Sequence, residues 1–288
     1  MARFTALDVH THRLTGDRRT QRESQLGDAA RLFDRDQPAE SPLEFYRSRQ
    51  LMAVVFDVDS ETTTGLRISN DEIAALARES EGRFIGFASV DPWKGAAAVA
   101  ELERCAALGL RGLKVQPVTQ ALYVNDRRFY PLWDACQSLG MPVVVHTGTT
   151  AMGNDSPGGR GLHLKYGRPI PAIDDVAADF PRLTIIAAHP GWPWHLELLA
   201  VARHKGNVYV DLSGTAPKYF PREVVTYLNS VMPHKFLFGS DYPLFGPDRW
   251  LAEFGRLDVK EHVRRKILYE NACEVLDVDV SLFGEVGC

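Results

Sequence analysis

The sequence is poor in the features that mark secreted and membrane proteins. Its 288 residues include only four cysteines (Cys105, Cys136, Cys273 and Cys288), and no two of them form a CxxC pair. In a chain of this length, such scarcity disfavours a disulfide framework and favours reduced thiols. No segment approaches the ~18 apolar residues of a membrane helix, and the opening residues lack the apolar stretch of a signal peptide. We therefore expect a cytoplasmic protein that has no membrane partner.

An excess of positive charge is also lacking. Lys and Arg number 33 against 37 Asp and Glu, which gives a formal net charge of -4. Domains that bind nucleic acid usually carry a basic surface, so the composition disfavours a nucleic-acid partner. Hydrophobic residues, in contrast, make up 45% of the chain. This share suffices for one large core, and we expect a single domain over residues 1–288.

Short segments of mainly apolar and β-branched residues recur along the chain. Eight of them cover residues 4–9, 52–58, 84–90, 112–116, 142–146, 184–188, 208–212 and 236–239. Most do not alternate with polar residues, which is typical of parallel strands buried on both faces. Helical patterns lie between strands, for example at 95–108, 222–231 and 260–270. This alternation predicts a (β/α)8 TIM barrel, with an open doubly wound sheet as the alternative.

Two connections are longer than a barrel requires. Residues 13–40 follow the first strand and carry Arg18, Arg19 and Arg22, whereas residues 147–171 follow the fifth strand and are rich in Gly, Thr and Pro. Both would leave the C-terminal ends of strands, where barrel enzymes hold their active sites. Long loops are often functional. We expect this of the second, while the first could equally be a solvated charged segment.

The segment Asp8-Val9-His10-Thr11-His12 contains the first candidate ligands. His10 and His12 are two residues apart, so both side chains leave the same face of an extended strand. Two imidazoles placed in this way can bind one cation such as zinc, iron or manganese. Two unrelated surface histidines would give the same pattern, so this motif alone does not decide.

Three further strands end in residues of the same kind. His146 ends the fifth predicted strand, His189 follows the sixth, and Asp241 follows the eighth. Because the C-terminal ends of barrel strands surround one cavity, these side chains would face His10 and His12. The sequence therefore predicts a metal site at the mouth of the barrel.

The motifs DxHxH, VVVHTG, AAHPGW and FGSDYP resemble those of the amidohydrolase superfamily. The resemblance runs from Asp8 to residues 269–272 and is strongest to the group that contains aminocarboxymuconate-semialdehyde decarboxylase and γ-resorcylate decarboxylase. It implies that one divalent metal ion is bound by His10, His12, His146 and Asp241, with zinc expected first and manganese or iron as alternatives. It also implies that His189 is the acid/base residue, that Asp241 shares in catalysis, and that the protein is a homodimer.

Lys114 lies in the fourth predicted strand, in the segment GLKVQP. A lysine inside a buried strand is costly unless it is paired or used. In some superfamily branches a carboxylated lysine at this position bridges two metal ions. The decarboxylase-like group lacks that bridge, so we expect Lys114 to be neutral or paired and to line the substrate pocket of a mononuclear site.

Other candidates for substrate binding lie in the connections after strands. Lys165 and Arg168 follow the fifth strand, Trp192 follows His189, and Tyr219 follows the seventh strand. Aromatic and cationic side chains together would suit a small, flat, anionic substrate. The tryptophan could instead simply pack on the top of the barrel.

Two reactions fit these residues. The first is hydrolysis of a carboxylated or aromatic-derived substrate, in which metal-activated water attacks a carbonyl group with the help of His189 and Asp241. The alternative is non-oxidative decarboxylation of an aromatic or muconate-type acid. A TatD- or PHP-like phosphoesterase is a minor alternative, because GLKVQP lacks the glutamate expected of TatD-like enzymes. A purely structural metal is disfavoured, since such sites are usually closed and peripheral.

Overall fold

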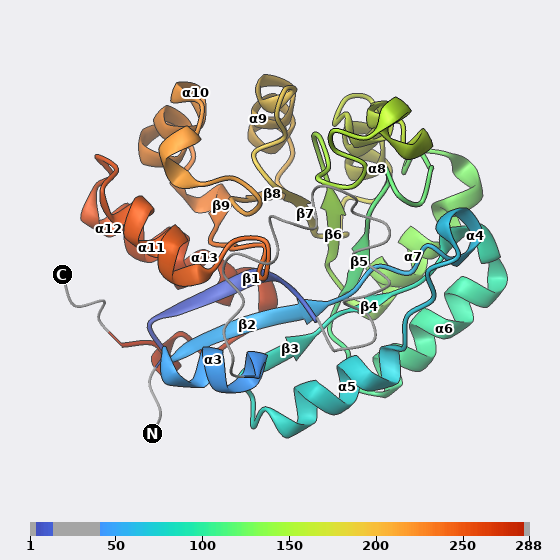
Figure 1. Cartoon of the computed structure of the whole chain (residues 1–288), viewed down its shortest axis with the longest axis horizontal. Coiled ribbons are helices and arrows are strands. Elements are labelled where there is room, and N and C mark those ends of the chain that lie inside the picture. Colours follow the sequence, from blue (N-terminus) through green and yellow to red (C-terminus); the bar gives the residue numbers. More distant parts are fainter. Residues whose placement is uncertain (1–3, 14–40, 285–288) are drawn as a thin grey trace.

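The computed structural model describes residues 4–13 and 41–284, and its strands lie in a ring with helices around them (Figure 1). All paired strands are parallel. The strands are β1 (Ala6–His12), β2 (Leu51–Phe56), β3 (Phe84–Gly86), β4 (Ala88–Ser89), β5 (Leu113–Val115), β6 (Val143–His146), β7 (Ile185–Ala188), β8 (Val208–Asp211) and β9 (Phe236–Leu237).

The third predicted strand is split, since β3 and β4 are separated by Phe87. The strands therefore form two ladders, β1-β2-β3 and β4 to β9 in sequence order. The Phe87 amide still donates to the Val55 carbonyl at 2.9 Å, so the split strand remains attached to β2. At the other junction, the amides of Val9 and His12 donate to carbonyls beyond β9, at 2.9 and 2.8 Å. These bonds join β1 to the last strand, and the predicted (β/α)8 barrel is confirmed.

Helices follow most strands and cover the outside of the barrel. They are α3 (Pro42–Ser48), α4 (Glu61–Thr64), α5 (Asn70–Glu79), α6 (Ala96–Ala107), α7 (Tyr130–Leu139), α8 (Ala172–Asp179), α9 (His195–His204), α10 (Arg222–Thr226), α11 (Pro247–Gly255), α12 (Glu261–Arg265) and α13 (Asn271–Leu276). The patterns at 95–108, 222–231 and 260–270 correspond to α6, to α10 with a π-helical continuation, and to α12 with another.

The strands consist mainly of apolar residues because both of their faces are buried in the core. Every residue of β2, β5, β6 and β7 is buried, and most of the buried hydrophobic side chains form one cluster. Burial on both faces removes apolar surface from water on the barrel side and on the helix side.

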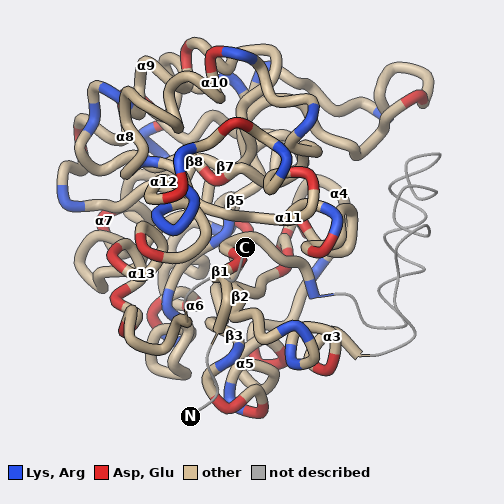
Figure 2. The backbone as a smooth tube through the Cα atoms, turned by 90° about the vertical axis from the view of Figure 1, so that its left-hand side faces the viewer, with Lys and Arg blue, Asp and Glu red and all other residues tan. Residues whose placement is uncertain are grey.

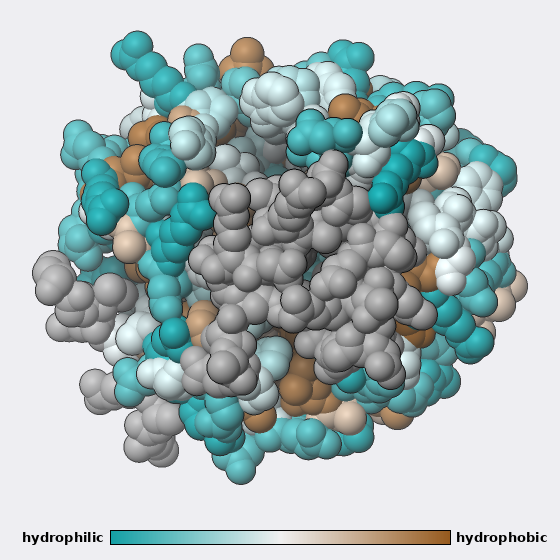
Figure 3. All heavy atoms as spheres, in the orientation of Figure 1, coloured by the Kyte–Doolittle hydropathy of each residue, from teal (hydrophilic) through white to brown (hydrophobic). Residues whose placement is uncertain are grey.

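The surface of the described residues is mixed in charge and polarity. Basic and acidic residues are interspersed along the backbone, and neither sign gathers on one side in Figure 2. The face in Figure 3 carries mainly hydrophilic side chains at its rim, with apolar residues in small separate groups. Within the described part of the chain, no helix combines the length and apolar character needed to cross a bilayer.

Of the two long connections expected from the sequence, the structure describes the second in full and only Arg13 of the first. Residues 147–171 connect β6 to α8 and contain the short 3-10 turns Pro157–Gly161 and Leu164–Gly167. The connection after β1, with Arg18, Arg19 and Arg22, lies outside the described residues apart from Arg13, as does Cys288.

Candidate active site

Five predicted site residues come together at the C-terminal ends of the strands. His10 and His12 lie on β1, His146 ends β6, His189 follows β7, and Asp241 follows β9. All five line one cavity of about 880 Å³. The sequence-based expectation that strand ends far apart in the chain share one cavity therefore holds.

Three of these residues form a cluster that fits a metal ion. The Asp241 Oδ1 atom lies 3.2 Å from His12 Nε2 and 3.4 Å from His10 Nε2. One donor atom from each residue lies within 4.8 Å of the other two. Two imidazole nitrogens and one carboxylate oxygen are a donor set suited to zinc, manganese or iron.

The orientation of His10 is set by Asp211, a residue that the sequence analysis missed. Asp211 Oδ2 lies 2.7 Å from His10 Nδ1, so a neutral His10 donates its Nδ1 proton there and keeps the Nε2 lone pair for the cavity. Burial alone would raise the pKa of Asp211, but the charge of His10 and its hydrogen bond hold that pKa below its usual range. A signal was present, because Asp211 ends β8 as His146 ends β6.

His146 and His189 form a second pair beside His10, since the His189 ring centre lies 4.9 Å from that of His10 and 4.6 Å from that of His146. His146 Nε2 lies 2.9 Å from the Thr149 carbonyl and must carry the proton, so His146 Nδ1 accepts from His189 Nε2 at 2.9 Å. Ser213 Oγ lies 2.9 Å from His189 Nδ1 and donates to it. In this arrangement His146 stands apart from the His10–His12–Asp241 cluster, and its role as a ligand stays a prediction.

The buried histidines are neutral at physiological pH. Burial and the charge of Lys114 lower the pKa of His10 to about 4. The same two causes lower the pKa of His146 to about 3. Burial and the neighbouring His146 and His10 lower the pKa of His189 well below its usual value. Neutral imidazole is the form that binds a metal ion.

Lys114 lines the cavity, as expected. Its side chain is buried within β5, and its Nζ atom lies 3.2 Å from His10 Nε2 and 4.7 Å from the centre of the Phe56 ring. An ammonium group here would compete with a metal ion for His10. The contact with His10 agrees with the expectation that Lys114 is paired, while a neutral Lys114 stays a prediction.

The backbone at His189 and Asp241 is in a conformation that side chains rarely adopt. Both residues have a φ of 70°, in the left-handed region. Next to His189 lies Gly214, with φ +67°, and a Cβ atom added there would lie 2.4 Å from His189 Nδ1. The position thus requires glycine for its backbone angle and for the close approach of the imidazole ring.

The predicted substrate-binding residues divide into two groups. Trp192 lines the cavity. Lys165, Arg168 and Tyr219 are not among its lining residues: Lys165 lies over Tyr123 and Tyr166, Arg168 pairs with Glu197 at 2.7 Å, and Tyr219 is 70% exposed. Their roles in substrate binding stay predictions.

Other walls of the cavity come from residues that the sequence analysis did not single out. The connection after β6 supplies a large part of one wall, between Thr149 and Leu164, so the expected involvement of this loop agrees with its position. Additional lining residues are Ser60, Leu66, Gln116, Thr119, Leu244, Phe245 and Arg249.

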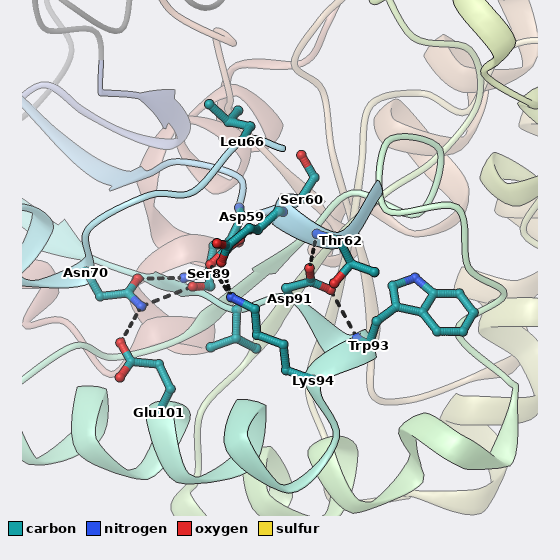
Figure 4. Close-up of polar contacts among 12 residues, drawn as sticks. Asp59, Ser60, Thr62, Leu66, Asn70, Ser89, Asp91, Trp93, Lys94 and Glu101 are labelled. Atoms are coloured by element: carbon teal, nitrogen blue, oxygen red, sulfur yellow. Dashed lines mark hydrogen bonds and ion pairs between the residues drawn. The ribbon is translucent and has the colours of Figure 1, made fainter. Parts of the chain in front are cut away.

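A polar network supports the wall that contains Ser60 (Figure 4) and connects it to Lys114. Ser89 Oγ accepts from the Asp59 amide at 3.0 Å and donates to the Lys114 carbonyl at 3.0 Å. The Asn70 side chain donates to the Ser89 carbonyl at 3.0 Å and to Glu101 at 2.8 Å. These bonds tie the connection after β2 to β5, and so they fix two lining residues relative to each other.

The fold and site define a TIM barrel that presents a histidine and carboxylate cluster at the C-terminal ends of its strands. A family model described as Amidohydrolase matches residues 7–278. The chain therefore belongs to the amidohydrolase family, as its motifs indicated.

Two curated relatives are decarboxylases by name. The 2-amino-3-carboxymuconate-6-semialdehyde decarboxylase of Dictyostelium discoideum is 24% identical over 239 residues, which cover 73% of this chain and 66% of that protein. The chain thus spans slightly less than two thirds of this relative. The gamma-resorcylate decarboxylase of Polaromonas sp. strain JS666 is 24% identical over 260 residues, with 72% and 74% covered.

Solved structures share the whole barrel. An uncharacterised TIM-barrel protein from Bordetella bronchiseptica superposes with a TM-score of 0.77 at 26% identity, covering 96% of this chain and 99% of that chain. A dihydroxybenzoic acid decarboxylase from Polaromonas sp. JS666, solved with manganese and the inhibitor 2-nitroresorcinol, has a TM-score of 0.69 at 17% identity, with 96% and 98% covered.

Proposed function

We propose that this protein is a metal-dependent, non-oxidative decarboxylase of a small aromatic or muconate-type acid. The observation that carries the proposal is the cluster of His10, His12 and Asp241 beside a neutral His189 in one cavity. The same cluster could support hydrolysis, which the sequence alone placed first. The names of both curated relatives favour decarboxylation instead.

His10, His12 and Asp241 would hold the metal ion, and His146 would join them through Nδ1 once that atom no longer accepts from His189. Manganese is our first candidate, because a structural neighbour contains it. Zinc and iron remain alternatives that the same donor atoms accept. When bound, such an ion acts as a Lewis acid that binds and polarises substrate oxygens.

The residues of the chain then hold the substrate and move one proton. In the reaction the bond between the substrate carbon and its carboxylate breaks, carbon dioxide leaves, and a proton adds to the same carbon. We assign proton delivery to His189, which lines the cavity, carries its proton on Nε2 beside His146 Nδ1 and accepts from Ser213 Oγ at Nδ1. The net proton comes from solvent, so His189 is restored after each turnover.

The test is a panel assay of the purified protein loaded with Mn²⁺. 2,6-Dihydroxybenzoate, 5-carboxyvanillate and 2-amino-3-carboxymuconate 6-semialdehyde are offered alongside aromatic lactones, and carbon dioxide release is measured. Release from one of the acids supports the proposal. Lactone opening without carbon dioxide release from any acid would instead identify a hydrolase.

The quaternary state is a separate proposal. The family resemblance favours a homodimer, which light scattering of the purified protein tests directly. A mass of twice 32.1 kDa is the expected result.

A further inference from the structure

The connection after β9 brings an arginine into the cavity. Asp241, Leu244, Phe245 and Arg249 all line it, and Arg249 lies on α11. Among the Lys and Arg residues at positions 4–13 and 41–284, only Lys114 and Arg249 line this cavity. The Lys114 side chain is deeply buried against His10, whereas that of Arg249 is 46% exposed. Arg249 is therefore the cation that an entering ligand can reach.

The Arg249 guanidinium is held from one side by a buried carboxylate. Its Nε atom lies 3.2 Å from Glu253 Oε1, one turn further along α11. The Glu253 side chain is only 10% exposed, and its Oε2 atom has no hydrogen-bond partner among the described residues. Lys218, in the connection after β8, approaches the same carboxylate at 3.8 Å. A buried carboxylate of this kind fixes the arginine in place.

The two Nη atoms of the Arg249 guanidinium are available to a ligand. Within the described part of the chain, the terminal Nη atoms of Arg249 make no hydrogen bond, because Glu253 engages Nε alone. Two Nη donors in one plane match the two oxygens of a carboxylate. The Phe245 ring lies 5.4 Å from the guanidinium carbon. Together with Leu244 it gives this corner an apolar wall for a flat substrate.

The cavity thus presents a candidate metal-binding cluster and, among the described residues, one accessible cation. The His10–His12–Asp241 cluster would hold the reacting carboxylate through its metal ion, and Arg249 lies eight residues beyond Asp241, on the helix that follows the eighth strand. We propose that Arg249 is a specificity-determining residue that binds a second carboxylate of the substrate, remote from the one that is lost. The substrate class is then an aromatic or conjugated dicarboxylate. This assignment rests on the proposed decarboxylase function.

Binding of two probes tests the assignment without any turnover. Benzoate and isophthalate differ by one carboxylate, and their affinities for the Mn²⁺-loaded protein are measured by titration calorimetry. We expect the wild type to bind isophthalate at least about tenfold more tightly, and the R249Q variant to lose this preference while its benzoate affinity is unchanged. R256Q is the matched control, because Arg256 ends the same helix, is exposed and does not line the cavity.

Several outcomes would overturn the role of Arg249. They are equal affinity of the wild type for both probes, a preference that persists in R249Q, and an equal loss of benzoate and isophthalate binding in R249Q. A protein that prefers isophthalate but releases no carbon dioxide from any acid would contradict the decarboxylase function alone. Carbon dioxide release without that preference would contradict Arg249 alone.

Discussion

The Asp211 carboxylate determines which nitrogen of His10 faces the cavity. Because Asp211 accepts the Nδ1 proton at 2.7 Å, the D211N variant, which can present an amide to the ring, loses this constraint. We expect its affinity for Mn²⁺ to fall about 10- to 100-fold, the usual cost of losing such a partner. Metal content after dialysis against graded Mn²⁺ measures the change. D134N, on the exposed side of α7, is the control, and equal affinity of D211N and D134N would contradict this role.

His189 is expected to act in chemistry and not in metal binding. Its Nε2 contacts His146 and its Nδ1 contacts Ser213, so both ring nitrogens are engaged, although His189 also lies within ligand distance of His10 and Asp211. For H189N we expect decarboxylation to slow by at least about 100-fold, the lower end of general acid catalysis, with unchanged Mn²⁺ content. H262N, which alters an exposed histidine of α12, serves as the control. Normal turnover in H189N would show that another group delivers the proton.

At the scale of elements, the turn after β8 is shaped around His189. Gly214 has φ +67°, and a Cβ atom there would lie 2.4 Å from His189 Nδ1. We expect G214A to lower the free energy of unfolding by about 1–3 kcal/mol, from backbone strain and the displaced ring, and to reduce turnover sharply. Urea unfolding and the carbon dioxide assay measure the two effects. G206A is the matched control, because its added Cβ meets no atom within 4 Å and its φ is ordinary. Equal stability of the two variants would contradict the argument.

The connection between β2 and α4 gives the protein a pH-dependent contribution to stability. Burial raises the pKa of Asp59, although the Glu61 amide and Lys94 partly oppose this. Above pH 3.8, the ordinary pKa of an aspartate, the native state keeps a proton that the unfolded state has released. The contribution of Asp59 to the free energy of unfolding therefore falls as the pH rises above this value. D59N keeps the acceptor for the Glu61 amide and removes the titration.

The effect of Asp59 is measured as the difference in free energy of unfolding between D59N and the wild type. Urea unfolding of wild type and D59N is compared at intervals from about pH 4 to about pH 7, the range above the ordinary aspartate pKa. We expect the stability of D59N relative to wild type to increase over this range. A constant difference would show that the environment of Asp59 does not perturb its protonation.

At the scale of the whole molecule, the features that local pattern determines were predictable from the sequence. Apolar runs that end in His146 or Asp241 mark a strand and its functional end together, and barrel closure then places those ends around one cavity. The split of the third strand at Phe87 could not be read in this way, because residues on both sides of the break are equally apolar.

Side-chain contacts between strands far apart in the chain could not be predicted from the sequence either. His10 and Asp211 are 201 residues apart, and only the closed ring of strands brings them to 2.7 Å. The hydrogen bond between Arg249 and Glu253 joins residues four positions apart on one helix. That Arg249 lines the cavity, however, depends on the strands that form the other walls. In contrast, Lys165 and Arg168 fit an anionic substrate by type, yet the structure places them outside the lining residues. Residue type alone does not show which side of a loop faces the cavity.

Removal of the metal should affect stability without affecting the fold. The hydrophobic cluster of the barrel contains none of the proposed ligands, so we expect the far-UV circular dichroism spectrum to stay the same after EDTA treatment. A ligand present at 100 times its Kd stabilises the native state by about 2.7 kcal/mol, which is worth roughly 5–10 °C in Tm for a domain of this size. We therefore expect EDTA to lower the Tm by several degrees and added Mn²⁺ to restore it. H12Q, which lacks one donor of the cluster, should show a much smaller Mn²⁺-dependent shift. If wild type and H12Q respond equally to Mn²⁺, the ion that stabilises the protein is bound elsewhere.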